Sequence, residues 1–253
     1  MAGPARRTPL DVSKVFSVAS NAWKQHLAIF VGITALVTWP GAVAPYFIEP
    51  STDPFDVMPM LIVLLISMVT QFIATAAITW GVFEHLAGRS FDLGGFLRAG
   101  VRSMWMALSV GSLYGILLVL GLLLCIIPGL FVASVFFVAV PAGVVERKGI
   151  GSAFNRSIFL TRGSRLPIVG LCVIYGLIYL AAGFLVTFVF GPGLDTTGQG
   201  PGSAEYTPSG QIVAFLLQIF LSSFVSTVTA ATYFLLRRQI EGLQVEDIAS
   251  VFD

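Results

Sequence analysis

Charged residues are scarce in this sequence, and so are cysteine and histidine. Asp, Glu, Lys and Arg make up 11% of the 253 residues, against roughly 25% in a soluble domain. Apolar residues make up 56%, and the mean hydropathy is +0.90. An ordinary soluble globular fold is therefore excluded. The net charge is only +1, so composition gives no indication of nucleic acid as a partner.

The sequence also lacks the motifs that carry most catalytic and metal chemistry. It has no Walker loop, HExxH, GxSxG or acidic cluster with metal-ligand spacing. Cys125 and Cys172 lie inside apolar runs without a CxxC pair, so we expect buried thiols rather than a disulfide or a metal site. We accordingly expect no catalytic residues, no metal and no cofactor, and we do not expect an enzyme.

Six segments are apolar and long enough to cross a bilayer, whose ~30 Å hydrocarbon core needs about 20 residues of helix. The third and fourth are separated only by Ile127, Pro128 and Gly129. Because proline removes a backbone donor and glycine accepts positive φ, we expect a tight hairpin at Pro128-Gly129. The chain, 1–253, then forms a single all-α membrane domain whose spans are 27–48, 58–83, 105–126, 130–145, 166–190 and 211–236.

Positive charge is confined to one side of this arrangement. All fourteen Lys and Arg residues lie in the N-terminal segment, the second connection, the stretch VERKGIGSAFNRSIFLTRGSR at 145–165, and the tail. The connections on the other side carry only acidic charges, at Glu49, Asp53, Asp56, Asp195 and Glu205. The positive-inside rule then predicts three hairpins across a bacterial inner membrane, with both termini in the cytoplasm.

The cytoplasmic segments are predicted to lie at the membrane surface, as interfacial segments at 10–24, 89–104 and 150–162 before a tail at 237–253. In the third, Ile150, Phe154 and Ile158 recur every four residues, whereas Arg156 and Arg162 point elsewhere. Cations there serve either as topology determinants with generic lipid contact or as a dedicated anionic lipid or phosphate site. We expect lipid-headgroup or partner contacts from Arg98, Arg102, Arg147, Lys148, Arg156, Arg162 and Arg165.

Ionisable side chains in the predicted spans occur only near the cytoplasmic ends. Glu84, Glu146 and Glu241 lie there, and we expect them to anchor the helix ends or to pair with arginines; the alternative is a proton- or cation-coupled site. Gln71 and Gln218 lie deeper and need a partner in hydrocarbon. They form either a structural pair or an intramembrane polar site for a substrate.

One run resembles a known bacterial family. Residues 128–163, PGLFVASVFFVAVPAGVVERKGIGSAFNRSIFLTRG, resemble the membrane domain of glycerophosphoryl diester phosphodiesterases and the related YciC-like proteins. That pattern is a Pro-Gly turn, a span ending in Pro and Glu, and an RSxxLTxG helix. The ending ATYFLLRRQIEGLQVEDIA is also similar. The resemblance implies a polytopic membrane module; the catalytic residues of such relatives lie in a separate domain, which we do not expect in this chain.

Two functions follow as expectations. The first is a non-enzymatic, lipid-interacting scaffold or accessory subunit of a membrane complex. Its partners would be anionic lipids and either another membrane protein or a second copy of this chain, with no nucleic acid. The alternative is a transporter or flippase for a lipid or a small amphipathic substrate, which would use the polar faces of the second and sixth spans.

Overall fold

The structure, a computed structural model, describes residues 10–48, 56–86, 93–147, 149–190 and 208–241. Six stretches within these ranges are long and apolar enough to cross a membrane, and no strand occurs in them. The expected all-α fold of a polytopic membrane protein is therefore confirmed. The helices are α1 Val12–Gln25, α2 Leu27–Phe47, α3 Met58–Leu86, α4 Leu93–Leu124, α5 Ile126–Phe136, α6 Ala139–Glu146, α7 Ile150–Thr161, α8 Arg165–Phe190 and α9 Pro208–Glu241.

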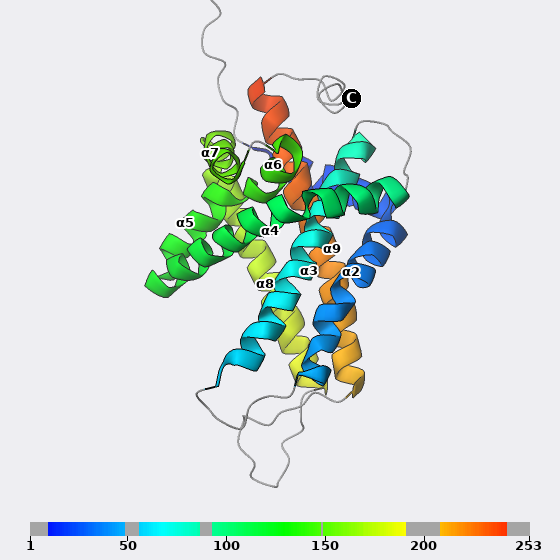
Figure 1. Cartoon of the computed structure of the whole chain (residues 1–253). Coiled ribbons are helices and arrows are strands. Elements are labelled where there is room, and N and C mark those ends of the chain that lie inside the picture. The colour runs from blue at the N-terminus through cyan, green and yellow to red at the C-terminus, as the bar shows by residue number, and fades with distance from the viewer. Residues whose placement is uncertain (1–9, 49–55, 87–92, 148, 191–207, 242–253) are drawn as a thin grey trace, which may run out of the picture.

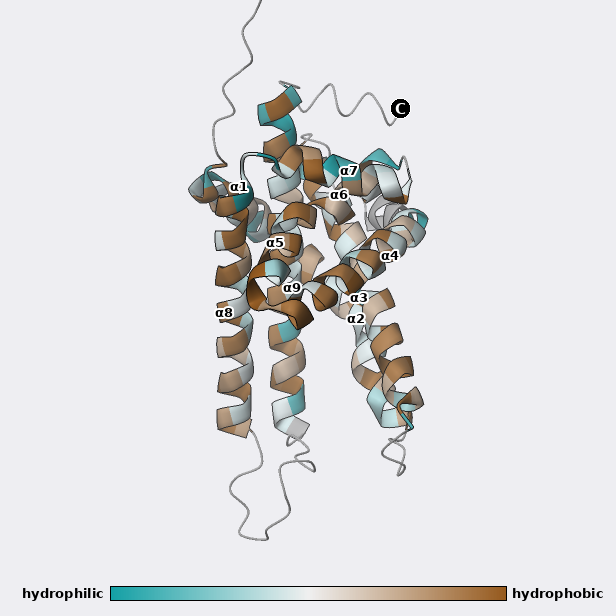
Figure 2. Ribbon diagram, turned by 90° about the vertical axis from the view of Figure 1, so that its left-hand side faces the viewer, coloured by the Kyte–Doolittle hydropathy of each residue, from teal (hydrophilic) through white to brown (hydrophobic). Residues whose placement is uncertain are grey.

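Four long helices, α2, α3, α8 and α9, run roughly alongside one another down the molecule, as Figure 1 shows. The shorter helices α1, α6 and α7 lie at one end, together with the C-terminal end of α9. We call this the charged end, because the strongly hydrophilic residues in Figure 2 gather there while the lengths of the long helices are mainly hydrophobic. This separation is the one that a bilayer imposes on a polytopic protein.

Helix α1 is an amphipathic helix that docks on the protein. Asp11 caps its start by accepting a hydrogen bond from the Ser13 backbone N–H at 3.0 Å. Near its end, the Trp23 indole N–H donates to Ser223 Oγ of α9 at 3.1 Å. The chain then turns at His26, whose Nε2 hydrogen-bonds to Nδ1 of His85 of α3 at 3.0 Å. The residues that α1 buries are Val15, Ala19 and Ala22.

The predicted interfacial segment at 89–104 is not a separate helix. Its described part, from Leu93 onward, is the beginning of α4, which continues to Leu124 without interruption. Figures 1 and 2 show α4 lying obliquely to the other long helices, and its hairpin with α5 stands away from them. The tip of this hairpin lies nearer to the charged end than the far ends of α2, α3, α8 and α9 do.

The turn between α4 and α5 lies at Cys125, not at Pro128-Gly129. Cys125 has an extended backbone (φ −178°, ψ 163°), and α5 begins at the next residue. Pro128 therefore sits in the first turn of α5, where a missing N–H costs little. The expectation of two buried thiols is also wrong for Cys125, which is exposed because the tip's side chains face outward; Cys172 is half-buried.

The fourth span is the most enclosed of the six. It consists of α5 and α6. In its most apolar stretch, 61% of the residues are buried inside the protein, against 17–33% in the other five spans. The helix is interrupted at Phe137 and Val138. Near this break, the Val135 carbonyl accepts hydrogen bonds from Ser157 Oγ at 2.8 Å and from Thr161 Oγ1 at 3.2 Å. These bonds fasten α7 to the core of the bundle.

Helix α7 packs one side against the protein and leaves most of the predicted apolar stripe exposed. Of that stripe only Phe154 is buried, whereas Ile150 and Ile158 are exposed. The buried side also contains the hydroxyls of Ser157 and Thr161, which a hydropathy pattern counts as polar. Since both hydroxyls are satisfied by Val135, the helix faces the core with a mixed apolar and hydroxyl surface.

Candidate functional site

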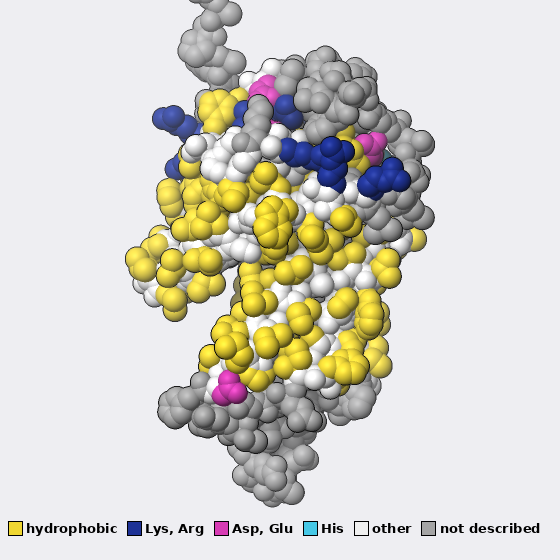
Figure 3. All heavy atoms as spheres, viewed as in Figure 1, with side chains coloured by type: hydrophobic (Ala, Val, Ile, Leu, Met, Phe, Trp, Pro, Cys, Tyr) yellow, Lys and Arg dark blue, Asp and Glu magenta, His cyan; other side chains and the backbone are white. Residues whose placement is uncertain are grey.

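A pocket of about 760 Å³ lies at the charged end, where α4, α6, α7 and α9 meet. Figure 3 shows Lys and Arg side chains in a band at this end of the molecule, above a mainly hydrophobic surface. We call the cavity the arginine pocket. It is lined by Arg102, Val145, Glu146, Arg147, Ser152, Asn155, Arg156, Phe159, Arg237 and Glu241.

Two of the four pocket arginines are neutralised by the two carboxylates. Arg156 of α7 donates through Nε to Glu146 of α6 at 2.6 Å and through Nη2 to Glu241 of α9. Arg237 lies one turn before Glu241 and donates to its second carboxylate oxygen at 2.8 Å. Tyr233 donates its hydroxyl proton to Glu146 at 2.9 Å. This network ties three helices together.

The other two arginines, Arg102 and Arg147, have no carboxylate partner among the described residues. Arg147 Nη2 donates to Ser103 Oγ at 3.1 Å, and its Nε donates to the Val144 carbonyl at 3.4 Å. Burial and, secondly, the charge of Arg102 lower the pKa of the Arg147 guanidinium. The charges of Arg156 and Arg237 are balanced by the two carboxylates. The surplus positive charge of the pocket therefore belongs to Arg102 and Arg147.

The backbone of Arg147 is itself unusual. Its φ of 49° and ψ of 24° place it in the left-handed region, and no other described non-glycine residue has a positive φ. Arg147 is the C-cap of α6, a position where glycine is ordinarily favoured, and its N–H bonds to the Gly143 carbonyl at 3.1 Å. A left-handed backbone is uncommon for a residue other than glycine, and such residues are often found at functional sites.

Only some of the predicted cationic contacts come together. Arg102, Arg147 and Arg156 share the arginine pocket. Arg98 and Arg162 are exposed and do not line it, and Lys148 lies outside the described residues. The remaining cation, Arg165 at the start of α8, lies with its guanidinium carbon 5.3 Å from the centre of the Phe131 ring.

The carboxylates divide in the same way. Glu146 and Glu241 are in the pocket network, whereas Glu84 at the end of α3 does not line the pocket. Sequence reasoning missed Arg237 and Tyr233 as members of the site. Arg237 could have been found, because it precedes Glu241 by four residues on one helix. Tyr233 gave no local signal, since its partner Glu146 belongs to α6.

The structure also brings Gln71 and Gln218 to one cavity. This cavity, which we call the amide cavity, has a volume of about 370 Å³ and lies between α2, α3 and α9. Gln218 also lines a smaller cavity of about 190 Å³ between α8 and α9. The amide cavity is lined by Thr38, Gly41, Ala42, Ser67, Met68, Thr70, Gln71, Phe72, Phe215 and Gln218.

Comparison with known proteins identifies the family. Residues 95–236 match the family described as "Domain of unknown function (DUF7847)", which is more than half of the chain. The chain belongs to this family. The DUF7847 region begins in α4 and ends in α9, so it contains Arg102, Arg147 and Arg156 but stops one residue before Arg237. The amide cavity draws two of its three helices from outside it.

No curated protein and no solved structure matches the chain. The family match does not name the glycerophosphoryl diester phosphodiesterase membrane domain or the YciC-like proteins, so that resemblance stays a prediction. In the described part of the chain, no group of three or more His, Cys, Asp or Glu residues could hold a metal ion.

Proposed function

We propose that this DUF7847 protein is a non-enzymatic membrane protein that binds an anionic lipid headgroup in the arginine pocket. The observation that carries the proposal is the pair formed by Arg102 and Arg147, which has no carboxylate partner among the described residues. In this role the protein acts as a scaffold or accessory subunit of a bacterial inner-membrane complex. A second membrane protein or a second copy of the chain would be its protein partner.

The charge pattern of the pocket favours a phosphate. Holding two guanidinium groups close together is unfavourable, and an anion between them relieves the repulsion. The planar fork of arginine suits phosphate oxygens because two N–H groups can donate to them in parallel. Ser152 and Asn155 add uncharged hydrogen-bonding groups to the wall. A phosphodiester headgroup, with a single negative charge, therefore finds both charge compensation and donors.

The position of the pocket favours a lipid as the source of that phosphate. The pocket lies at the charged end, where the apolar surface of the long helices gives way to cations. Under the positive-inside rule this end faces the anionic cytoplasmic leaflet, which supplies headgroups at this level. The resemblance of residues 128–163 to membrane domains whose catalytic domain is separate fits a protein that presents lipid to a partner.

The pocket chemistry supports binding rather than catalysis. Its two carboxylates, Glu146 and Glu241, are both ion-paired with arginines. A general base needs a group that is free to take a proton within reach of the substrate. The described lining residues contain no histidine or cysteine that could replace them. A charged clamp whose two carboxylates are both ion-paired is the arrangement of a binding site.

The test is lipid binding by the full chain in phosphatidylcholine nanodiscs with and without phosphatidylglycerol. Phosphatidylglycerol should stabilise the protein against thermal unfolding, and Arg102→Gln or Arg147→Gln should weaken its apparent affinity about tenfold, because losing a charge-assisted hydrogen bond to the phosphate costs about 1.5 kcal/mol. Arg238→Gln is the matched control, since it removes the same charge from an exposed site outside the pocket. Equal losses in all three variants would contradict a dedicated site.

A transporter or flippase is the second candidate, and the amide cavity is the observation that favours it. Against it, the stretch of α3 and α9 between the amide cavity and the arginine pocket is filled by buried small residues, including Ala76, Ala77 and Ala230. Thr75 and Ser226 hydrogen-bond across the same interface at 3.3 Å. Proteoliposomes that moved a labelled lipid, with flux lost in Gln71→Leu, would favour the transporter over the scaffold.

A further inference from the structure

The amide cavity holds two polar side chains at membrane depth that no other described residue satisfies. Gln71 is half-buried and Gln218 is exposed, and neither side-chain amide hydrogen-bonds to another described residue. Each lies well inside a helix that is long and apolar enough to cross the membrane. In hydrocarbon, an amide without a partner is costly, and such groups are ordinarily paired or serve a ligand. The two amides converge on one cavity without pairing with each other.

The hydroxyl groups in the wall do not satisfy these amides. Thr38 Oγ1 donates to the Thr34 carbonyl at 2.7 Å, and Thr70 Oγ1 donates to the Ile66 carbonyl at 3.0 Å. These are bonds within their own helices. The side chains of Gln71 and Gln218 thus keep two N–H donors and one carbonyl acceptor each for a ligand.

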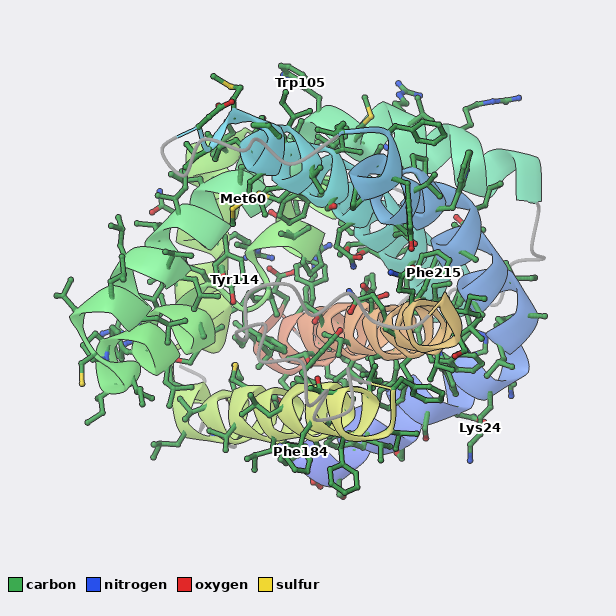
Figure 4. All side chains as sticks on the ribbon, turned by 90° about the horizontal axis from the view of Figure 1, so that it is seen from below. Lys24, Met60, Trp105, Tyr114, Phe184 and Phe215 are labelled. Atoms are coloured by element: carbon green, nitrogen blue, oxygen red, sulfur yellow. The ribbon has the colours of Figure 1, made fainter. Side chains whose placement is uncertain are left out.

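The residues that line the amide cavity favour an uncharged ligand. The described lining contains no ionisable side chain that could compensate a charge, and an unpaired charge at this depth is far more costly than a neutral polar group. Phe72, Phe215 and Met68 supply apolar contacts beside the amides; Figure 4 shows Phe215 on the side of α9 that faces α2 and α3. A flat or compact headgroup with oxygen acceptors matches this combination of apolar wall and amide donors.

The route to the cavity favours a lipid. Several large apolar residues on the neighbouring helices are exposed, including Leu64 of α3 and Ile212 and Leu216 of α9. A bilayer covers such surfaces with acyl chains, so a ligand with an apolar tail can remain in hydrocarbon while its headgroup enters. The volume of about 370 Å³ accommodates a small headgroup but not a whole lipid.

We propose that the amide cavity binds the uncharged, oxygen-bearing headgroup of a neutral lipid, held by hydrogen bonds from Gln71 and Gln218. Alcohol-type lipids such as diacylglycerol and quinone-type lipids share this chemistry. This site is separate from the arginine pocket and does not depend on it. The membrane protein would then carry two lipid sites of different charge preference, one at the charged end and one at membrane depth.

The experiment uses the full chain in phosphatidylcholine nanodiscs, titrated with dioleoylglycerol in one arm and with a short-tailed menaquinone in the other. Unfolding is followed by tryptophan fluorescence. We expect at least one arm to stabilise the protein, and Gln71→Leu or Gln218→Leu to weaken that binding about tenfold, because leaving ligand oxygens without donors costs ~1.4 kcal/mol. Gln239→Leu is the matched control, since it makes the same change on α9 outside the cavity.

Folding and the proposed function are controlled independently. Leucine suits a lipid-facing helix, so both variants should keep their helical circular dichroism and their stabilisation by phosphatidylglycerol. Conversely, Arg102→Gln should bind the neutral lipid normally. The proposal is overturned if neither lipid stabilises the wild-type protein, or if Gln71→Leu and Gln218→Leu both bind the neutral lipid like wild type. It is also overturned if Gln218→Leu dissociates a dimer while neutral lipid has no effect, since the amides would then form a subunit contact.

Discussion

At the scale of single residues, Arg147 combines three features that each lower the stability of the folded protein. Its backbone adopts a left-handed conformation, its guanidinium loses part of its hydration in the pocket although the residue as a whole is exposed, and Arg102 is close enough to lower its pKa. Left-handed backbone costs a non-glycine residue roughly 1–2 kcal/mol, and the other two effects add to it. A residue that served stability alone would be a glycine here. Arg147 is thus the position where stability and binding are expected to oppose each other.

Replacing Arg147 by glycine should separate these two properties. We expect Arg147→Gly to unfold with a free energy about 1 kcal/mol higher than Arg147→Ala, because only glycine adopts this backbone without strain. Both variants should bind phosphatidylglycerol more weakly than wild type, as expected for Arg147→Gln. Chemical denaturation in detergent measures the difference. The same pair at Arg238, in the regular helix of α9, should show the opposite order, since alanine is favoured over glycine there.

The sequence identified individual site residues better than their contacts. Arg147, Arg156 and Glu146 were predicted from charge placed beside a span. That Arg102 would join Arg147 could not be predicted, because it depends on how α4 lies across α6 and α7. Gln71 and Gln218 were predicted from polarity at depth, and a shared cavity was one of two alternatives that the sequence left unresolved.

At the scale of elements, the hairpin of α4 and α5 depends on close backbone contact. A Cβ added to Gly121 would lie 3.0 Å from the Gly129 Cα and 3.3 Å from its nitrogen. These neighbours are backbone atoms, which cannot move aside as a side-chain end can. Gly115 on the same helix has only the far end of Met68 near it, at 3.8 Å. A side chain added at Gly121 would therefore clash with the backbone of α5, whereas one added at Gly115 would make only an ordinary contact.

A leucine at Gly121 should force the hairpin open. We expect Gly121→Leu to lower the free energy of unfolding by about 1–3 kcal/mol, the usual cost of overpacking. Gly115→Leu should change it much less, because its Cβ site is open. Thermal unfolding of both variants in one detergent provides the comparison. Similar losses in both would show that α4 and α5 do not cross at Gly121.

Element boundaries show where sequence patterns are insufficient. The spans were predictable from apolar length alone, yet the turn was placed at Pro128-Gly129 because proline and glycine are the usual breakers. The structure breaks at Cys125 instead and uses Pro128 in the first turn of α5. The segment before the third span contains Gly94, Gly95 and Gly100, yet α4 begins at Leu93 and continues through these glycines to Leu124. Neither boundary can therefore be placed from the positions of proline and glycine alone.

At the scale of the whole molecule, the described cations gather at one end, and Asp56 precedes α3 at the other. A side chain that stays on the cytoplasmic side need not be carried through hydrocarbon during insertion. This sorting was fully visible in the sequence, because it depends on the order of charges along the chain. The oblique position of the hairpin of α4 and α5 was not visible, because it depends on packing against α3 and on the buried span of α5 and α6.

Cysteine labelling tests both the sidedness and the depth of this hairpin. In a background where Cys125 and Cys172 are replaced, a membrane-impermeant maleimide should label Val57→Cys, beside Asp56, in spheroplasts. It should reach Lys24→Cys only after permeabilisation.

The depth of the hairpin is tested by restoring Cys125 alone, which should give no labelling from either side. Its side chain is exposed, but the hairpin tip lies nearer to the charged end than the far ends of the long helices do, so hydrocarbon surrounds it and a polar reagent does not reach it. Labelling of Val57→Cys and Lys24→Cys from the same compartment would contradict the topology. Labelling of Cys125 from the outside would instead show that this hairpin crosses the whole bilayer.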